Sequence, residues 1–510
     1  MEAKLRTEAI EYLRHVCNTS FTQEETAETI VPDAYPDMQT IVDVEGNITL
    51  RSKTAEAGRV SLNGAIAASV VYLPEGEDIL RKLELTIPFT AGCDAGDVTD
   101  DTRICVMVTL IGIDARMLNS RKALIRADIL VEIQGYGDSV IDYAAEIEDE
   151  GEAGLQIRRE EVEVSFVSQV REKTFAISDE FHLPAGLPPF GEILKSQVRL
   201  SADDVKNVGN KLIFKGTANI HVMYAAQQTG EPHTAEFSAT FSQIMEMEGE
   251  ADESSYEIAL MLTNVYLESG ASEGSTLAAE LHLVAQAVET RRHMLPYISD
   301  AYSTRFSLEA GRMEHQLESL EPLQEVGAEV RESVELPVGM VRVVDYSVRT
   351  GKVSVSQEGG RLQLKSAVNI SAVYLTEEST LTAFNRRFEA VAEMDLMPHM
   401  TYTATVRAGE SGQIIPSADG AEIRVPVHFT VRPCRKMRFT ALNALRWDEE
   451  HPRDLASLPS VVVFSAEGGE SLWHLAKRYC STEPLIVGAN GIGEDAVPYP
   501  GQMFIIPKAR

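Results

Sequence analysis

Apolar and polar residues alternate over long stretches of this chain. Residues 126–133, RADILVEI, and residues 423–432, IRVPVHFTVR, each carry apolar side chains at every second position. Successive side chains of a strand point to opposite faces of its sheet, so this period is typical of a half-buried strand. Turn-like segments rich in Gly, Asn and Asp separate such runs. The pattern predicts a mainly β protein.

Three copies of one β unit repeat along the chain. Each contains an apolar run ending in a tyrosine, and the tyrosines are spaced by 152 and 150 residues. A small residue lies eight positions before each tyrosine, and a proline closes a short apolar strand further upstream. The proline, small residue and tyrosine are Pro32, Gly64 and Tyr72, then Pro184, Gly216 and Tyr224, then Pro337, Ser366 and Tyr374. We expect three tandem β-sandwich-like or barrel-like units, with the tyrosines in their cores.

Two segments show a helical period instead. Near the N-terminus, Leu5, Ala9, Leu13 and Val16 share one helical face, which predicts a short amphipathic helix packed on the first copy. A partner-binding helix is the alternative.

Near the C-terminus, residues 471–479 predict a capped helix and residues 481–490 a second one, before a closing strand, QMFIIP. This order of strand, helix, helix and strand describes a small α+β module. We expect Trp473 to be buried or half-buried, because it lies beside the closing strand.

These signals divide the chain into eight parts. The acidic segment AEIEDEGEAG marks one linker. RMEHQLESLEPL, which we expect to form a short helix, marks a second, and the Pro-containing RWDEEHPRDLASLPS marks a third. The predicted parts are an N-terminal helix (1–22), the first repeat (23–144), an acidic linker (145–165), the second repeat (166–310), a linker (311–328), the third repeat (329–445), a linker (446–460) and the C-terminal module (461–510).

Charge and cysteine usage narrow the function classes. The chain has 46 Lys and Arg against 78 Asp and Glu, a net charge of −32, so nucleic acid and anionic lipid surfaces are poor partners. The five cysteines are scattered and form no C-x-x-C motif, which favours free thiols in a reducing compartment. The first residues carry charges where a signal peptide needs an apolar core, so we expect a cytoplasmic protein.

None of the possible catalytic or metal-binding motifs in the sequence meets the structural requirements of that motif. GASEG, residues 270–274, matches G-x-S-x-G, but the repeat register places Ser272 in a hairpin turn rather than between a strand and a helix. The aspartates of DAGDVTDDT, residues 94–102, lack the spacing of a calcium loop. No histidine spacing suits zinc. We therefore expect neither an enzyme nor a metal or cofactor site.

The C-terminal module resembles the LysM family. GESLWHLAKRY, then Asn490, then GQMFIIP follow the LysM pattern, with the family's spacing from Tyr479 to Asn490. Glu470 replaces the usual Asp, and Ala466 a strand Val. The resemblance implies binding of N-acetylglucosamine-containing glycans, such as peptidoglycan, through two loops. The candidate binding residues, for a glycan or a protein partner, are Gly469, Glu470, Ser471, Leu472, Trp473, Leu485, Asn490, Tyr499, Gly501 and Gln502.

The repeats resemble the SPOCS domain of spore-forming Firmicutes. LTIPF, residues 85–89, the long hairpin of residues 106–133 and DAYSTRFSLE, residues 300–309, carry the resemblance. Tandem SPOCS domains before a LysM module are similar to clostridial spore coat morphogenetic proteins that bind the ATPase of the coat's basement layer. The resemblance implies a non-enzymatic assembly factor, made in the mother cell and held on the forespore surface, whose LysM module recruits that ATPase and whose repeats contact other coat proteins. The alternative is a LysM protein that binds the peptidoglycan of the cortex or cell wall.

Overall fold

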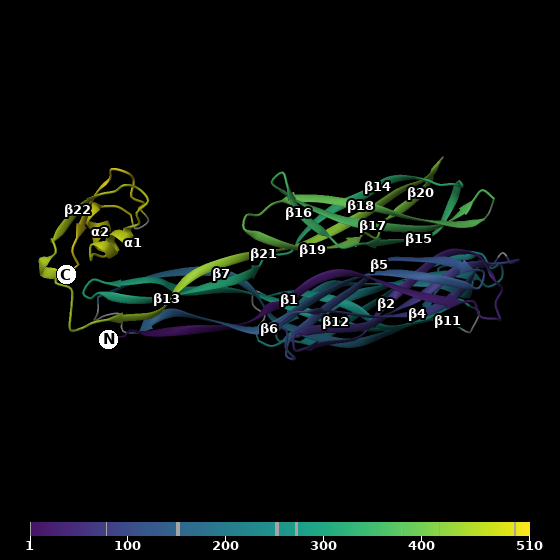
Figure 1. Cartoon of the computed structure of the whole chain (residues 1–510), viewed down its shortest axis with the longest axis horizontal. Helices are drawn as coiled ribbons and strands as arrows, with labels where there is room; N and C mark the ends of the chain where they lie inside the picture. The colour runs from purple at the N-terminus through teal and green to yellow at the C-terminus, as the bar shows by residue number, and fades with distance from the viewer. Residues whose placement is uncertain are drawn as a thin grey trace.

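The molecule is elongated, with a wide head, a narrow stalk and a small module at the far end of the stalk (Figure 1). The computed structural model describes residues 2–77, 79–148, 154–249, 254–270, 274–378, 380–417, 419–493 and 496–509. The prediction of a mainly β protein is confirmed, and both α-helices of these residues lie in the C-terminal module. None of the described helices has the length and apolarity needed to span a bilayer.

The first two copies have the same six-strand plan. The middle strands form a three-stranded antiparallel sheet, while the first, last and fifth strands pair in a second sheet that faces it. The first copy comprises β1 (Lys4–Ile30), β2 (Met38–Glu56), β3 (Arg59–Pro74), β4 (Arg81–Asp94), β5 (Arg103–Asn119) and β6 (Lys122–Glu148). The second comprises β7 (Leu155–His182), β8 (Phe190–Val208), β9 (Lys211–Ala226), β10 (Pro232–Glu246), β11 (Ser254–Ser269) and β12 (Thr276–Ser303).

The third copy repeats this plan with three of its strands interrupted. β13 and β14 together correspond to β1, β15 and β16 to β2, and β19 and β20 to β5, because each pair shares one partner strand. Its strands are β13 (Leu308–Leu320), β14 (Gln324–Glu335), β15 (Met340–Thr350), β16 (Ser354–Glu358), β17 (Arg361–Thr376), β18 (Leu381–Asp395), β19 (Met400–Ala408), β20 (Gln413–Ser417) and β21 (Gly420–Trp447).

The tyrosines of the repeat are core positions, as expected, and the small residues are buried beside them, whereas Pro32, Pro184 and Pro337 are exposed. Tyr72, Tyr224 and Tyr374 are fully buried. Eight residues earlier, Gly64 and Gly216 pair across the sheet with Phe89 and Phe241, and a Cβ at Gly216 would lie 2.2 Å from the Ser201 carbonyl oxygen. In the third copy the cross-strand partner is Ala390 instead of a phenylalanine, and the small residue is Ser366. A phenylalanine ring packed against the backbone therefore requires glycine at this position, and where the ring is absent a serine fits.

The three copies close around a common axis in the head. Val42, Leu194 and Val344, 30 residues before the three tyrosines, share one buried cluster. The next residue in each copy is charged and buried: the Lys195 ammonium lies 2.6 Å from Asp345 and also pairs with Asp43. Burial alone would lower the pKa of Lys195, but the two carboxylates raise it. Each copy therefore contributes the same position to one apolar and one ionic layer.

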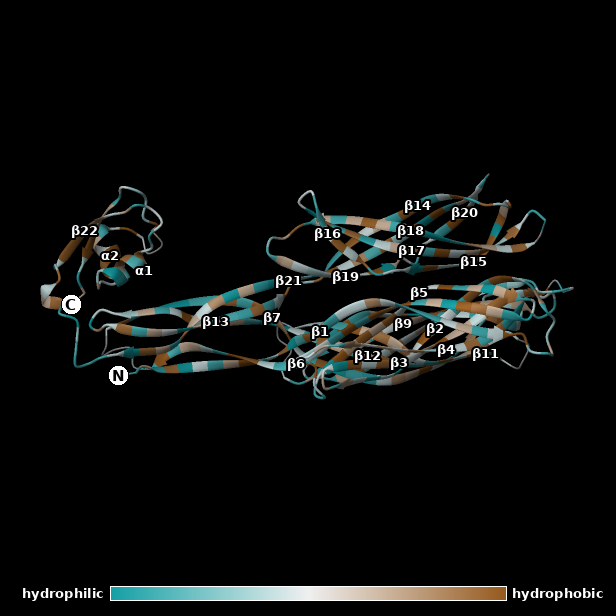
Figure 2. Ribbon diagram, viewed as in Figure 1, coloured by the Kyte–Doolittle hydropathy of each residue, from teal (hydrophilic) through white to brown (hydrophobic). Residues whose placement is uncertain are grey.

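The stalk consists of three two-stranded ribbons, one from each copy. Beyond their sandwiches, β1 pairs with β6, β7 with β12 and β13 with β21. Aromatic side chains of the ribbons meet inside the stalk: Tyr12 stacks on Phe166 at 4.4 Å and Tyr297 lies 4.7 Å from Phe439. Figure 2 shows apolar and polar residues alternating along these strands. A single ribbon is marginally stable in water, so the shared core stabilises all three.

The prediction of an N-terminal helix over residues 1–22 is wrong, because residues 4–22 belong to β1. Bulges between Arg6 and Thr7 and between His15 and Cys17 shift the buried face of this strand, so its apolar residues lose the period of two and mimic a helix. Much of the predicted linkers 145–165 and 311–328 is also strand: β6, β7, β13 and β14 run through them as stalk and sandwich. The segment RMEHQLESLEPL is not a helix.

Replacing Lys195 with Met should destabilise the chain by about 3–5 kcal/mol, because two buried carboxylates would lose their countercharge. Lys206→Met on the same strand is the matched control, since Lys206 pairs with Asp204 at the surface; its effect should stay within about 0.5 kcal/mol. Urea unfolding measures both. Equal midpoints for the two variants would contradict an ionic layer that the head depends on.

Gly216→Ala should cost about 1–3 kcal/mol, because the new methyl group meets the Ser201 carbonyl and the Phe241 ring. Gly327→Ala, where a Cβ meets no atom within 4 Å, should be neutral or slightly stabilising. Thermal unfolding of both variants tests the packing explanation of the small residue, and an unchanged melting temperature for Gly216→Ala would refute it.

Candidate binding module at the end of the stalk

The C-terminal module is a two-stranded sheet covered by two short helices. β22 (Val461–Ser465) and β23 (Met503–Pro507) pair antiparallel, and α1 (Leu472–Arg478) and α2 (Glu483–Asn490) lie on one side of them. A 3-10 turn (Leu455–Ser457) lies in the connection from β21. Phe464, Phe504 and Ile506 point inward with Leu475 and Ile486. The predicted order of strand, helix, helix and strand is confirmed.

Several predicted binding residues hold the module together. Ser471 caps α1 by accepting a hydrogen bond from the His474 amide at 3.2 Å. The Glu470 carboxylate accepts bonds from the amides of Glu467 and Gly468, which hold its pKa below the usual range. These three backbone contacts form a tight turn before the helix.

Asn490 and Gln502 fasten the second half of the module. The Asn490 amide donates to the Ile486 and Ile505 carbonyls, and its oxygen accepts from the Ile505 amide at 2.7 Å, so it joins α2 to β23. Gln502 accepts from the Tyr499 amide. Gly501 and Gly469 have φ of 82° and 92°, the left-handed region that glycine adopts without strain. Leu472 is buried. These predicted residues therefore have local structural contacts.

Trp473 fixes the module to the stalk. It is only 5% exposed, as expected for a buried side chain. Its ring meets Tyr302 of β12 edge-on at 4.9 Å, and its Nε1 donates to Asp300 at 2.9 Å. Lys477 also binds Asp300, at 2.6 Å, and the Tyr302 hydroxyl donates to the Ser481 carbonyl. The stalk thus supplies one wall of the module's core.

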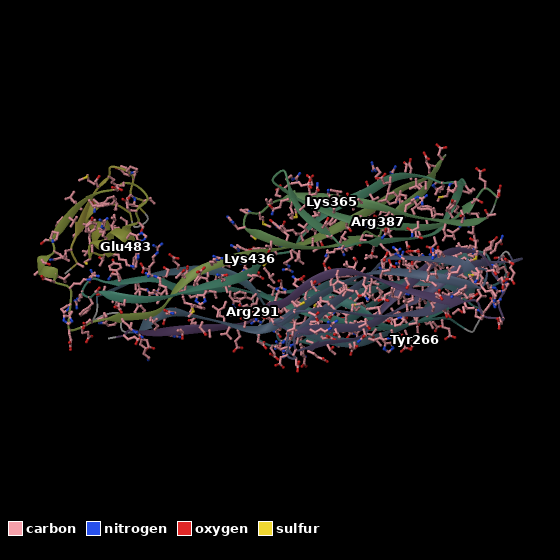
Figure 3. The ribbon with its side chains drawn as sticks, in the orientation of Figure 1. Tyr266, Arg291, Lys365, Arg387, Lys436 and Glu483 are labelled. Carbon is pink, nitrogen blue, oxygen red and sulfur yellow. The ribbon has the colours of Figure 1, made fainter. Side chains whose placement is uncertain are left out.

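The sequence reasoning missed Asp300 and Tyr302 as contact residues. They lie in DAYSTRFSLE, a segment used only for the family resemblance, and no spacing rule relates them to a helix 170 residues later. Burial alone would raise the pKa of Asp300, but the bonds from Lys477 and Trp473, together with Arg312, lower it. Glu483 lies on the stalk-facing side of the module (Figure 3), and burial raises its pKa.

The opposite side of the module is an exposed apolar face. Val461 and Val463 on β22 and Met503 and Ile505 on β23 are each between 44% and 61% exposed. Val463 and Ile505 are direct cross-strand neighbours. We call these four residues the outer face. Leu485 and Tyr499, the remaining predicted binding residues, are also exposed.

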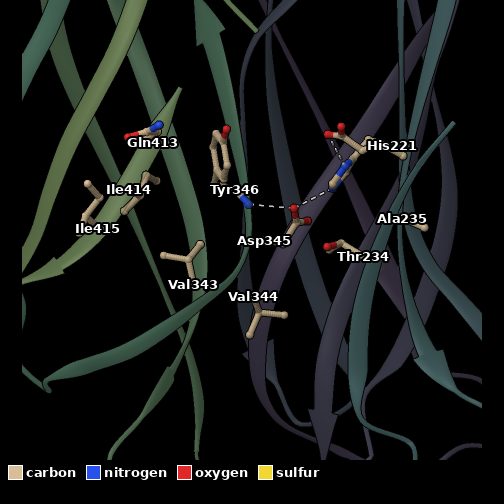
Figure 4. A pocket seen from close by; sticks show the side chains of 11 residues that line it. His221, Thr234, Ala235, Val343, Val344, Asp345, Tyr346, Gln413, Ile414 and Ile415 are labelled. Atoms are coloured by element: carbon tan, nitrogen blue, oxygen red, sulfur yellow. Dashed lines mark hydrogen bonds and ion pairs between the residues drawn. The ribbon is translucent and has the colours of Figure 1, made fainter. Parts of the chain in front are cut away.

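A cavity of about 430 Å³ lies elsewhere, in the seam between the second and third copies (Figure 4). His221 and Glu236 of the second copy face Asp345, Tyr346 and Gln413 of the third across it. His221 Nε2 lies 2.7 Å from Asp345, which raises the histidine pKa against the effect of burial. No predicted site residue lies there. The described residues contain no group of His, Cys, Asp and Glu placed to hold a metal ion, and Ser272 lies outside them.

The contact between module and stalk should weaken in acid. Released Asp300 regains an ordinary aspartate pKa, about 4, so protons favour the undocked state and docking weakens as the pH falls through and below that value. Trp473 fluorescence, read in a Trp447→Phe background, should shift to the red as the ring meets water. In Asp300→Asn, docking should be weaker at neutral pH and should no longer depend on acid. Identical acid profiles for the two proteins would contradict a role of the Asp300 charge.

Family comparisons agree with this architecture. The model of the SipL SPOCS domain matches residues 37–118 and 190–268, which run from β2 into β5 and from β8 into β11. The LysM domain matches residues 468–507. No curated protein matches the chain. The third copy lies outside the matched segments but has the same strand plan. The chain therefore combines SPOCS domains in its head with a LysM domain at the end of its stalk, and both are binding-type rather than catalytic domains.

Proposed function

We propose that this chain is a non-enzymatic scaffold of spore coat assembly, and that its LysM domain recruits another coat protein through the outer face. The SPOCS domain associates the chain with the spore coat. The observation that carries the finer proposal is an apolar face on the solvent side of a domain whose Trp473 is already engaged by the stalk.

The composition of the LysM domain supports a protein partner. A contiguous exposed apolar patch usually marks an interaction site. Residues 455–510 carry four Lys and Arg and five Asp and Glu, a net charge of 4 − 5 = −1, so the remaining residues carry −32 − (−1) = −31. A partner of either sign can therefore approach this end of the molecule with little repulsion, whereas the head and stalk repel acidic surfaces.

The ATPase of the coat's basement layer is our first candidate partner, on the strength of the family resemblance. The stalk holds the LysM domain away from the head, so the head stays accessible to further coat proteins while the domain is occupied. In this proposal the chain is made in the mother cell and acts at the forespore surface.

Peptidoglycan binding is the second candidate. The two loops that bind glycans in the LysM family lie side by side here, since the Gly501 amide donates to the Ala466 carbonyl and the Ala466 amide to the Gln502 carbonyl. Tyr499, beside them, is 63% exposed and could stack on a sugar ring. This observation favours a glycan in the loops, and it concerns residues other than the outer face.

The two functions separate by mutation in the full chain. We expect Val463→Glu to weaken capture of the purified coat ATPase at least tenfold, about 1.4 kcal/mol, because it places a charge in an apolar contact. Tyr499→Ala, an equally exposed site in the same domain, is the matched control and should leave capture unchanged. The readouts are a pull-down with the ATPase and co-sedimentation with purified sacculi.

The pattern of outcomes decides between the candidates. Recruitment is supported if Val463→Glu is the variant that loses capture of the ATPase and if neither the unmodified chain nor either variant sediments with sacculi. Sedimentation of the unmodified chain that Tyr499→Ala abolishes and Val463→Glu preserves would replace recruitment with a peptidoglycan anchor. The full chain is required, because a fragment that lacks Tyr302 exposes Trp473 and creates an apolar surface of its own.

A further inference from the structure

Two cysteines of the first copy are in direct contact. Cys17 on β1 and Cys93 on β4 are free thiols whose Sγ atoms lie 3.1 Å apart. The strands belong to the two facing sheets of the sandwich, so the contact crosses its core. Among the five cysteines, all of which the structure describes, these are the two whose sulfur atoms it places together.

The contact lies at the neck, where the first ribbon leaves the head. Cys17 directly follows the bulge at His15, the point at which β1 passes from the stalk into the sandwich. In the second copy the equivalent residue, 152 positions on, is Gln169, and it joins β7 to the segment that follows β10. Its amide donates to the Glu248 carbonyl and its oxygen accepts from the Glu248 amide at 2.9 Å. A side-chain contact from the first strand of the copy to the fourth strand, or to the segment just after it, thus recurs at this position.

We propose that Cys17 and Cys93 are a disulfide site, which closes when the protein meets a low-molecular-weight disulfide such as oxidised glutathione. One cysteine thiolate attacks the glutathione disulfide, displaces one glutathione thiolate and forms a mixed disulfide. The second cysteine thiolate then attacks the protein sulfur of that mixed disulfide and displaces the other glutathione. One S–S bond breaks and one forms, and the two protons of the cysteines end on two reduced glutathione molecules.

The surroundings of the pair determine how it reacts. Burial, helped by the Cys17 contact, raises the pKa of Cys93 to about 12. Asp94 raises it further and Arg59, which pairs with Asp94 at 2.6 Å, lowers it. Little Cys93 thiolate therefore exists near neutral pH, so the step in which Cys93 attacks a disulfide should be slow there. The thiols stay reduced in a reducing compartment and close after the protein enters an oxidising one.

Closing the bond would link β1 to β4 across 76 residues of sequence. A cross-link over such a span stabilises a protein mainly by restricting its unfolded chain. It would fasten the first sandwich at the neck, next to the ribbon on which the stalk depends. The oxidised head should therefore unfold at higher temperature than the reduced head.

The test uses the full-length protein, reduced first and then incubated with oxidised glutathione in its native state. After acid quenching and denaturation, alkylation and mass spectrometry count the free thiols. We expect the number of free thiols to fall from five to three. A non-reducing gel should show no cross-link between chains, and the Cys17 and Cys93 peptides should be joined by a disulfide. The melting temperature should rise, and a reductant should reverse the rise.

Two single variants supply the controls. Cys93→Ser should keep all four remaining thiols and show no rise in melting temperature. Cys105→Ser removes another core cysteine but leaves the pair, so its count should fall from four to two. Five free thiols in the treated unmodified protein would overturn the proposal, as would a stable glutathione adduct, a cross-linked dimer or a bond that maps to other cysteines. Each of these outcomes is measured on the protein without substitutions, so the test remains decisive even if one of the variants fails to fold.

Discussion

The long first and last strands of each copy impose the constraint on which the rest of the structure depends. The first and last strands of every copy run beyond its sandwich as a ribbon that cannot bury its own apolar face. Three such faces can be buried together, as the cluster around Tyr143, Tyr297 and Phe439 shows. Packing the ribbons into one stalk brings the three sandwiches around a common axis, and it carries the end of β12 to the place where the LysM domain docks.

The ionic layer at the axis distinguishes the copies from one another. Equivalent positions carry Asp43, Lys195 and Asp345, and a second buried pair joins Glu45 to Arg349. Ion pairs in a low-dielectric core contribute little net stability, since removing the charges from water offsets their attraction. Val42, Leu194 and Val344 beside these charges supply the apolar burial.

The repeats and the LysM fold could be predicted from local patterns, whereas the stalk and the docking contact could not. Alternation and the tyrosine register are properties of single strands and of their recurrence. The ribbons fall in segments whose charge and irregular period resemble linkers, and β1 in particular is interrupted by two bulges. Its strand conformation is set by pairing with β6, whose partner residues lie between 92 (Ile30 with Lys122) and 144 (Lys4 with Glu148) positions away. Tertiary pairing of this kind overrides local propensity.

The candidate site shows the same division. The sequence marked the LysM residues as one group, but it could not separate Asn490 and Glu470, which hold the domain together, from Trp473, which docks it. That distinction depends on Asp300 and Tyr302, which reach the domain only through the fold of the stalk. The outer face escaped notice for a related reason, because alternating apolar residues on both sides of β22 and β23 appear equally buried until the sheet is seen to be covered on one side only.

Hydrogen exchange of the full chain, with and without the purified coat ATPase, tests the central claim most directly. The account predicts that the partner slows exchange in Val461–Ser465 and Met503–Pro507, while α1 and the end of β12 keep the protection they already have. Slower exchange confined to the loops 466–471 and 496–502, or faster exchange in α1 when the partner binds, would contradict a LysM domain that stays docked on the stalk and presents its outer face.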